Sequence, residues 1–156
     1  MIIESEREVL TMTDMKIINF DMDGTLNSFY DVEGWLEDLI ANNPRPYVQA
    51  KPSCDFRVLA RRLNVLINNG YKVRIVSWLA KNSNEDFDNQ VIYAKKQWLK
   101  KHLPSVKFDK IIIVPYGTPK ETLSNGILFD DEENNRNNWK GVAYDVNNIL
   151  DILKTL

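Results

Sequence analysis

Apolar residues along the chain occur either in short continuous runs or at intervals of three and four positions. Continuous runs of this length predict buried strands, and the wider spacing predicts amphipathic helices. The runs predict strands at 16–20, 71–76, 110–114, 126–129 and 141–144, and the wider spacing predicts helices at 31–41, 55–69, 83–102 and 146–156. Because strands alternate with helices, we expect an α/β fold with a parallel central sheet.

The region around the third predicted strand carries two further expectations. Its apolar run at 111–114 contains no polar residue, so we expect this strand to be buried on both faces. Thr118 followed by Pro119 is typical of a helix start and would place Lys120 in the first helical turn. A cation at that position repels the helix dipole unless an anion binds there, so the pattern indicates an anion site.

Length and composition bound the possible classes of protein. The 156 residues predict one domain at 16–156, preceded by a frayed or weakly helical N-terminal extension at 1–15. Apolar residues make up 44% and no apolar run reaches the roughly 20 residues of a membrane helix, which predicts a soluble protein. The net charge of -2 argues against binding of long nucleic acid. A lone Cys54 and the lack of a secretory segment favour a cytoplasmic location.

The first predicted strand ends in a turn that contains two carboxylates, Asp21 and Asp23, followed by Gly24. Ligands of open parallel sheets bind beyond the carboxyl ends of the strands, so both carboxylates lie where chemistry is expected. Two carboxylates this close favour a bound cation or a retained proton. One could attack phosphorus as a nucleophile while the other transfers protons.

This turn resembles the first motif of the haloacid dehalogenase-like (HAD) phosphohydrolases, since residues 20–26 read Phe-Asp-Met-Asp-Gly-Thr-Leu. The resemblance implies a three-layer Rossmann-like fold with a mostly parallel sheet, helices on both faces and a small helical cap inserted at about 27–51. It also implies that Asp21 is the nucleophile, that Asp23 is the general acid and base, and that both bind Mg²⁺. Gly24 and Thr25 are then expected to contact the substrate.

Residues at three other predicted strand ends match the later motifs of that family. The resemblance implies that Ser77 holds a phosphoryl oxygen and that Lys120 stabilises the phosphate and the nucleophile, with Lys110 and Lys140 as alternatives. It further implies that Asp130 and Asp131 bind Mg²⁺, which prefers oxygen ligands. The common pattern has a further Asp four or five residues later, and here asparagines stand there instead, at Asn134 and Asn135.

Three features have more than one interpretation. The helix at 31–41 either covers the mouth of the site as a cap or packs its apolar face on the core. Trp78 could stack on a nucleobase, and core packing or a lid contact explains it equally well. Lys95, with Lys96, Lys100 and Lys101, is expected on the outside of the helix at 83–102, and a solvated face is favoured over a nucleic-acid contact.

The expected function is therefore a Mg²⁺-dependent phosphomonoester hydrolase that acts through an aspartyl-phosphate. Ser77-Trp78 and the Asp130-Asp131 pair look similar to compact nucleotidase-like members and to the phosphatase part of polynucleotide kinases. A nucleoside monophosphate or other small phosphorylated metabolite is the expected substrate, with the 3'-phosphate of a nucleic-acid end as the alternative. A phosphotransferase, a phosphonate-cleaving enzyme and a HAD-like binding protein without turnover also remain open.

Overall fold

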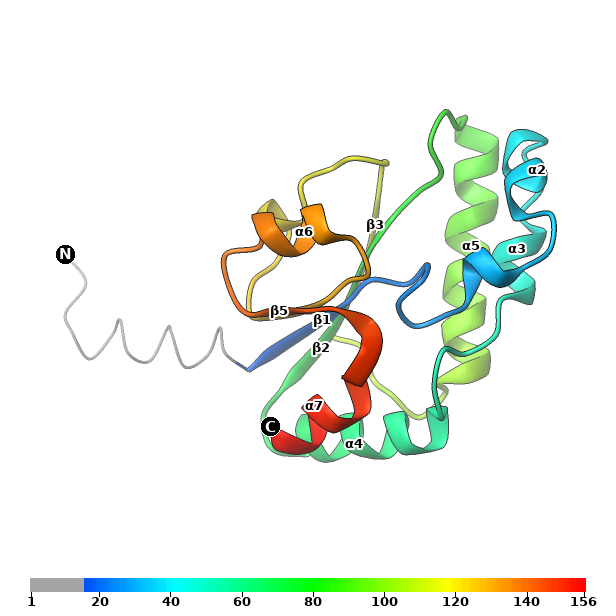
Figure 1. Cartoon of the computed structure of the whole chain (residues 1–156). Coiled ribbons are helices and arrows are strands. Elements are labelled where there is room, and N and C mark those ends of the chain that lie inside the picture. The colour runs from blue at the N-terminus through cyan, green and yellow to red at the C-terminus, as the bar shows by residue number, and fades with distance from the viewer. Residues whose placement is uncertain (1–15) are drawn as a thin grey trace.

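The computed structural model describes residues 16–156, so the extension expected at 1–15 lies outside the described residues. Its centre is a five-stranded sheet with the strand order β3-β2-β1-β4-β5, in which every pairing is parallel. The strands are β1 (Ile17–Phe20), β2 (Lys72–Trp78), β3 (Lys110–Val114), β4 (Ile127–Phe129) and β5 (Ala143–Tyr144). This confirms the expected α/β fold and the parallel sheet (Figure 1).

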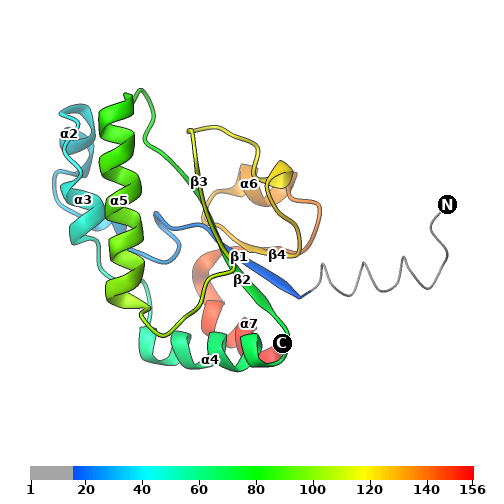
Figure 2. The same ribbon diagram turned by 180° about the vertical axis from the view of Figure 1, so that it is seen from behind.

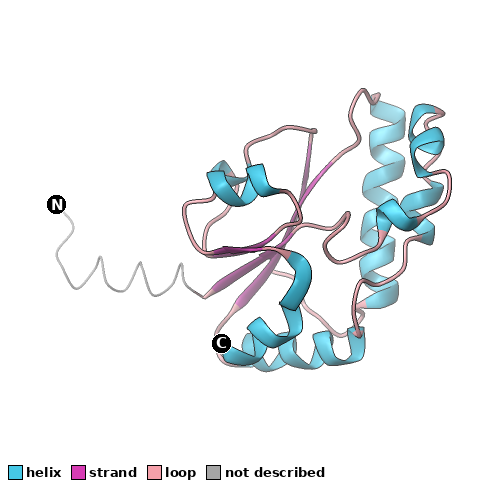
Figure 3. Ribbon diagram, viewed as in Figure 1, coloured by secondary structure: helices cyan, strands magenta, loops and turns pink. Residues whose placement is uncertain are grey.

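Helices connect the strands and flank the sheet (Figure 3). The helices are α2 (Trp35–Ile40), α3 (Arg45–Gln49), α4 (Phe56–Asn68), α5 (Glu85–His102), α6 (Glu133–Asn138) and α7 (Ile149–Thr155). Three short 3-10 turns add to them: η1 (Phe29–Asp31), η2 (Lys120–Thr122) and η3 (Val146–Asn148). No helix in residues 16–156 combines the length and the apolar character needed to cross a bilayer.

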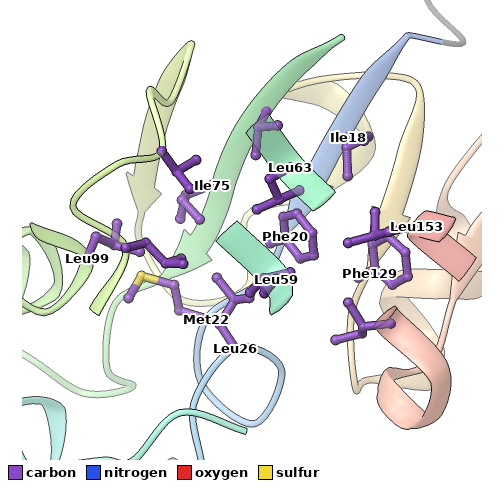
Figure 4. Packing of buried hydrophobic residues seen from close by; sticks show 14 of the residues in the cluster. Ile18, Phe20, Met22, Leu26, Leu59, Leu63, Ile75, Leu99, Phe129 and Leu153 are labelled. Carbon is purple, nitrogen blue, oxygen red and sulfur yellow. The ribbon is translucent and has the colours of Figure 1, made fainter. Parts of the chain in front are cut away.

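Alternate residues of the central strands form the main hydrophobic core. Ile18 and Phe20 of β1 are fully buried, and Phe20 stacks on Phe129 of β4 with 5.1 Å between ring centroids (Figure 4). Side chains of α4, α5 and α7 complete the same cluster, for example Leu63 and Leu153. The intervening Asn19 of β1 belongs to no apolar cluster, and its amide instead donates to the backbone oxygens of Asn125 and Ile127.

The segment between β1 and α4 differs from the single helix expected at 31–41. It contains η1, α2 and α3: α2 ends at Ile40, Asn42 follows with a φ of +54°, and Pro44 is the N-cap residue of α3. Both α2 and α3 lie beside α5, as views from the front and from behind agree (Figures 1 and 2). No residue of α2 is buried, so this helix contributes little to the main core.

The expectation that the third strand is buried on both faces is wrong. β3 is an edge strand that pairs only with β2, and none of its residues is buried. Ile111 retains 36% of its surface exposed. A run of isoleucines describes the residues' preference for strand conformation, and it does not determine the place of the strand in the sheet.

Candidate functional site

The strand order places a natural ligand site at the carboxyl ends of β1 and β4. The chain runs from β1 outward to β2 and β3, and then returns to β4 on the other side of β1. Adjacent strands whose connections leave in opposite directions open a crevice beyond their carboxyl ends. Asp21 follows β1 and Asp130 follows β4, so the two carboxylates flank this crevice.

Lys120 joins the two carboxylates into one buried cluster. Its ammonium donates to Asp21 Oδ1 at 3.0 Å and to Asp130 Oδ2 at 2.7 Å. All three residues are at most 6% exposed. Burial disfavours the ammonium ion, but the charges of Asp21 and Asp130 outweigh that effect and raise the pKa of Lys120. Of the three lysines considered for this position, Lys120 is therefore the one that contacts Asp21, whereas Lys110 and Lys140 are both exposed.

The helix predicted to start at Thr118 is not formed. Lys120 begins η2, a single 3-10 turn of three residues, and the surrounding segment between β3 and β4 is largely loop (Figure 3). Such a turn has no helix dipole of useful size, so there is no helix N-terminus here that could bind an anion. Two buried carboxylates account for the buried cation instead.

Asp130 and Asp131 hold their positions through the backbone and through neighbouring side chains. Asp130 accepts from the Glu132 N–H at 2.9 Å and from the Asn135 amide at 3.1 Å. Asn135, one of the two asparagines that stand where the common pattern has a further Asp, thus contacts Asp130 directly. The hydroxyl of Thr25 donates to Asp21 Oδ2 at 2.9 Å and accepts from the Asp131 N–H at 3.2 Å.

In the described part of the chain, Asp21, Asp130 and Asp131 form the group that could hold a metal ion, with one oxygen of each within 4.8 Å of the others. Burial and the negative charge of Asp21 raise the pKa of Asp130 to about 6 and that of Asp131 to about 8. Where ionised carboxylates are disfavoured without a metal ion, a bound divalent ion stabilises their charged forms most. Three carboxylates also provide the oxygen donors that Mg²⁺ prefers, so the residues present fit this ion.

Asp23 lies apart from this group and has a different partner. Its Oδ2 accepts from the ammonium of Lys95 at 3.0 Å, and its Oδ1 lies 3.5 Å from the Asn27 amide. Burial raises the pKa of the Asp23 carboxyl, and the charge of Lys95 opposes that rise. The carboxyl of Asp23 thus favours the protonated form more than a free aspartate does, as a proton donor requires.

Lys95 is a site residue that the sequence analysis placed wrongly on the solvated face of its helix. It is 1% exposed and also donates to Ser77 Oγ at 2.6 Å and to the Trp78 carbonyl oxygen at 2.8 Å. A signal was present in the spacing, because position 95 follows Val91 by four residues and precedes Trp98 by three. It therefore belongs to the same stripe as the apolar residues of the helix.

A cleft of about 550 Å³ opens above the carboxylates. Its lining combines polar residues at the floor with a wall of aromatic and apolar side chains. The polar residues include Asp21, Asp23, Lys120, Asp130, Glu132 and Asn135, and the wall includes Tyr30, Trp35, Leu36, Leu39, Ile40, Trp78 and Tyr116. Its size and this mixture are typical of a site for a small molecule.

The remaining predicted residues differ in whether they reach the cleft. Trp78 lines it, while the indole N–H donates to the Thr118 carbonyl oxygen at 2.8 Å and the ring lies 5.2 Å from the Lys120 ammonium. Ser77 and Thr25 are fully buried and are not among its lining residues. Gly24 has a φ of +82°, and a Cβ there would lie 2.5 Å from Asp131 Oδ2. In this geometry Thr25 and Gly24 help to position the carboxylates of Asp21 and Asp131.

Comparisons with known proteins add no identification: no protein-family model matches the chain, and no curated protein matches it. The arrangement itself has a definite chemistry. One buried carboxylate, Asp21, lies beside a cation and in a group that could bind a metal, and a second, Asp23, lines the same cleft with a raised pKa. A nucleophile and a proton carrier are therefore available at one site.

Proposed function

We propose that this protein is a Mg²⁺-dependent phosphomonoester hydrolase of the HAD type. The observation that carries the proposal is the buried cluster of Asp21, Lys120 and Asp130 at the floor of the cleft. Asp21 precedes Lys120 by 99 positions, and Asp130 follows Lys120 after a further 10, which is the chain order that the HAD motifs require. The acidic turn at Asp21 would not by itself need a buried lysine or a second carboxylate at the next strand end.

Asp21, Asp23 and Lys120 have separate roles in the proposed reaction. A carboxylate oxygen of Asp21 attacks phosphorus, and the bond from phosphorus to the leaving oxygen breaks while Asp23 gives that oxygen its proton. Water then attacks the aspartyl-phosphate, Asp23 takes a proton from the water, and the bond from Asp21 to phosphorus breaks. Lys120 stabilises the negative charge beside Asp21 throughout.

Asp21, Asp130 and Asp131 would hold Mg²⁺, as their convergence and their raised pKa values support. When bound, the ion neutralises charge on the phosphoryl oxygens and orients the phosphoryl group. Asp23 was expected to be a further ligand, but its carboxylate pairs with Lys95 instead.

The wall of the cleft supports a substrate whose leaving group is flat or apolar. Tyr116 and Trp78 lie with ring centroids 5.1 Å apart, and Leu36 and Ile40 of α2 add apolar surface to the same cleft. A nucleoside monophosphate combines a phosphate with a base that such surfaces bind well. We therefore place it first, with a nucleic-acid 3'-phosphate as the alternative that the same screen addresses.

The first experiment measures phosphate release from p-nitrophenyl phosphate with Mg²⁺, for the wild-type protein and for Asp21→Asn. We expect activity that chelation of Mg²⁺ abolishes and that Asp21→Asn lowers by at least about a thousandfold, since the covalent step is lost. Asp151→Asn is the matched control, because this aspartate is exposed on α7. Equal activity in Asp21→Asn and wild type, or no activity on any phosphoester, would contradict the proposal and favour a binding protein.

The second experiment compares nucleoside monophosphates with 3'-phosphorylated oligonucleotides at equal concentration. Higher kcat/KM on the mononucleotides is expected because the size of the cleft suits a small molecule. Trp78→Ala tests the contribution of base stacking, and it should lower kcat/KM for nucleotides more than for small alkyl phosphates. Unchanged relative rates in this variant would remove stacking on Trp78 from the proposal.

A further inference from the structure

Three oxygen atoms of the protein occupy the whole ammonium group of Lys95. A lysine ammonium has three hydrogens and no acceptor, and here the three contacts are Asp23 Oδ2, Ser77 Oγ and the Trp78 carbonyl oxygen. The ring centroid of Tyr47 lies 5.2 Å from the same nitrogen and covers it further. A buried lysine costs free energy unless all its donors are satisfied, and in this position they are.

The cleft contains Asp23 but not Lys95 among its lining residues. Lys95 therefore contacts Asp23 from behind and does not touch a molecule bound in the cleft. By holding Oδ2, with the Asn27 amide 3.5 Å from Oδ1, it restricts rotation of the carboxyl group and so fixes how this group is presented to the cleft. The two lysines of the site consequently have separate partners: Lys120 holds the nucleophile, and Lys95 holds the proton carrier.

We propose that Lys95 is a positioning residue, which aims the Asp23 carboxyl at the leaving-group oxygen and ties it to the end of β2 through Ser77. The inference rests on the proposed phosphatase function. In the first step the proton passes from Asp23 to the leaving oxygen as the P–O bond breaks, and in the second step Asp23 regains a proton from water. Lys95 neither gains nor loses a proton in either step.

The contact with Lys95 gives Ser77 a more specific role than a phosphate contact alone. Because Lys95 can only donate, the Ser77 oxygen accepts, and the hydroxyl hydrogen is free to point elsewhere. Ser77 is fully buried, so it fixes Lys95 relative to the strand end. Asp23, Lys95 and Ser77 thus form a chain of contacts from the cleft to the sheet.

The dependence of the rate on the leaving group tests this role. p-Nitrophenolate departs readily without a proton, whereas an alkoxide needs one, so loss of an aligned general acid affects alkyl phosphates more. We expect Lys95→Met to lower kcat on propyl phosphate at least about tenfold more than on p-nitrophenyl phosphate, with little change in KM. Both substrates are measured on one sample of the full chain, so the ratio does not depend on the fraction of folded protein.

Three further variants make the result decisive. Lys96→Met is the matched control, since the next residue of the helix is exposed, and it should leave the ratio unchanged. Asp23→Asn should reproduce the selective loss, and adding Lys95→Met to it should not increase that selectivity. If Lys95→Met gives no folded protein, Lys95→Gln, which keeps two donors, is measured in its place, and we expect a smaller selective loss.

Equal loss on both substrates in Lys95→Met, or in its glutamine replacement, would overturn the inference and leave Lys95 with a purely structural role. A greater selective loss in the double variant than in Asp23→Asn would also overturn it, because Lys95 would then act independently of Asp23. Both outcomes differ from failure of the proposed function, in which the wild-type protein cleaves neither ester.

Discussion

At the scale of single residues, the site depends on a buried lysine that is shared by two buried carboxylates. Lys120 contacts two carboxylates, and the carboxylates of Asp21 and Asp130 would repel each other without it. A buried ion pair adds little stability compared with apolar residues, but removal of one partner leaves a buried charge without compensation. The residue proposed to support catalysis therefore also supports the fold.

Replacement of Lys120 by methionine should lower the free energy of unfolding by about 3 kcal/mol at neutral pH in the presence of a chelator. The cause is the two uncompensated carboxylates, and the measurement is urea denaturation. Lys110→Met is the control, because Lys110 is exposed at the start of β3. A loss of stability no larger than that of the control would mean that Asp21 and Asp130 adopt other partners.

Gly24 links backbone conformation to the position of a carboxylate. We expect Gly24→Ala to reduce Mg²⁺ affinity, because the added Cβ would lie 2.5 Å from Asp131 Oδ2 at a φ of +82°. Gly117→Ala provides a matched control, since Gly117 has a φ of +84° and no atom within 4 Å of the added Cβ. Both variants should lose about 1 kcal/mol of stability from the strained backbone. Isothermal titration with Mg²⁺ should show weaker binding only for Gly24→Ala, and equal affinities would contradict the explanation.

At the scale of elements, α2 packs Trp35 and Leu39 against the smaller hydrophobic cluster around Phe29, and it leaves its other apolar residues exposed beside the cleft. Leu36 is 50% exposed and Ile40 is 76% exposed, and both line the cleft. An amphipathic helix usually buries its apolar face against the protein, so exposed leucine and isoleucine beside a cleft indicate a surface that a ligand covers. This observation favours the cap interpretation of the segment over simple core packing.

The double substitution Leu36→Ser and Ile40→Ser should accordingly raise KM for phosphate esters with large apolar leaving groups, by about tenfold for two side chains removed from the contact. KM for a small ester such as glycerol phosphate should change little, and so should the melting temperature. Val65→Ser on α4 is the control, since Val65 is 54% exposed and does not line the cleft. Equal changes in KM for large and small esters would show that α2 does not contact the leaving group.

The sequence was sufficient for the strands and for the residues at their ends, and insufficient where tertiary contacts decide. Short apolar runs followed by Asp21 and Asp130 identified two neighbouring strand ends, because the pattern and the chemistry agree there. Lys95 was missed because a lysine among other lysines is usually solvated, and only its partners in space justify its burial. Lys120 was placed correctly for the wrong reason, since the helix that supported the argument is a single 3-10 turn.

At the scale of the whole molecule, the carboxylate group is assembled only when β1 and β4 pair. Asp21 and Asp130 are 109 positions apart in the sequence, and the Asp21 N–H donates to the Phe129 carbonyl oxygen at 3.0 Å. The unfolded chain holds these groups apart in water, where each carboxyl ionises near its usual pKa of about 4. Protons and metal ions that bind this group are therefore linked to folding.

The raised pKa values give this linkage a sign. Between about pH 4 and pH 6 the folded protein retains protons on Asp130 and Asp131 that the unfolded chain has already lost, and between about pH 6 and pH 8 it retains the proton on Asp131. Their contribution to stability is complete below pH 4 and is lost as pH rises through about 6 and about 8. His102 opposes this trend, because burial lowers its pKa, and its contribution to stability therefore rises with pH up to about 6.5, the usual pKa of a histidine.

Asp131→Asn separates these contributions, because it removes one charge and leaves His102 unchanged. In a chelator at pH 8, this variant should melt at a higher temperature than the wild-type protein, and the difference should shrink towards pH 5, where Asp131 is largely protonated.

Mg²⁺ should raise the melting temperature of the wild-type protein more at pH 8 than at pH 5, since the ion competes with protons, and should have little effect on the variant. Melting curves across this pH range with and without Mg²⁺ provide the measurement. An equal Mg²⁺ effect in both proteins would remove Asp131 from the metal site, and a lower melting temperature of the variant at pH 8 in chelator would mean that its charge is compensated within the fold.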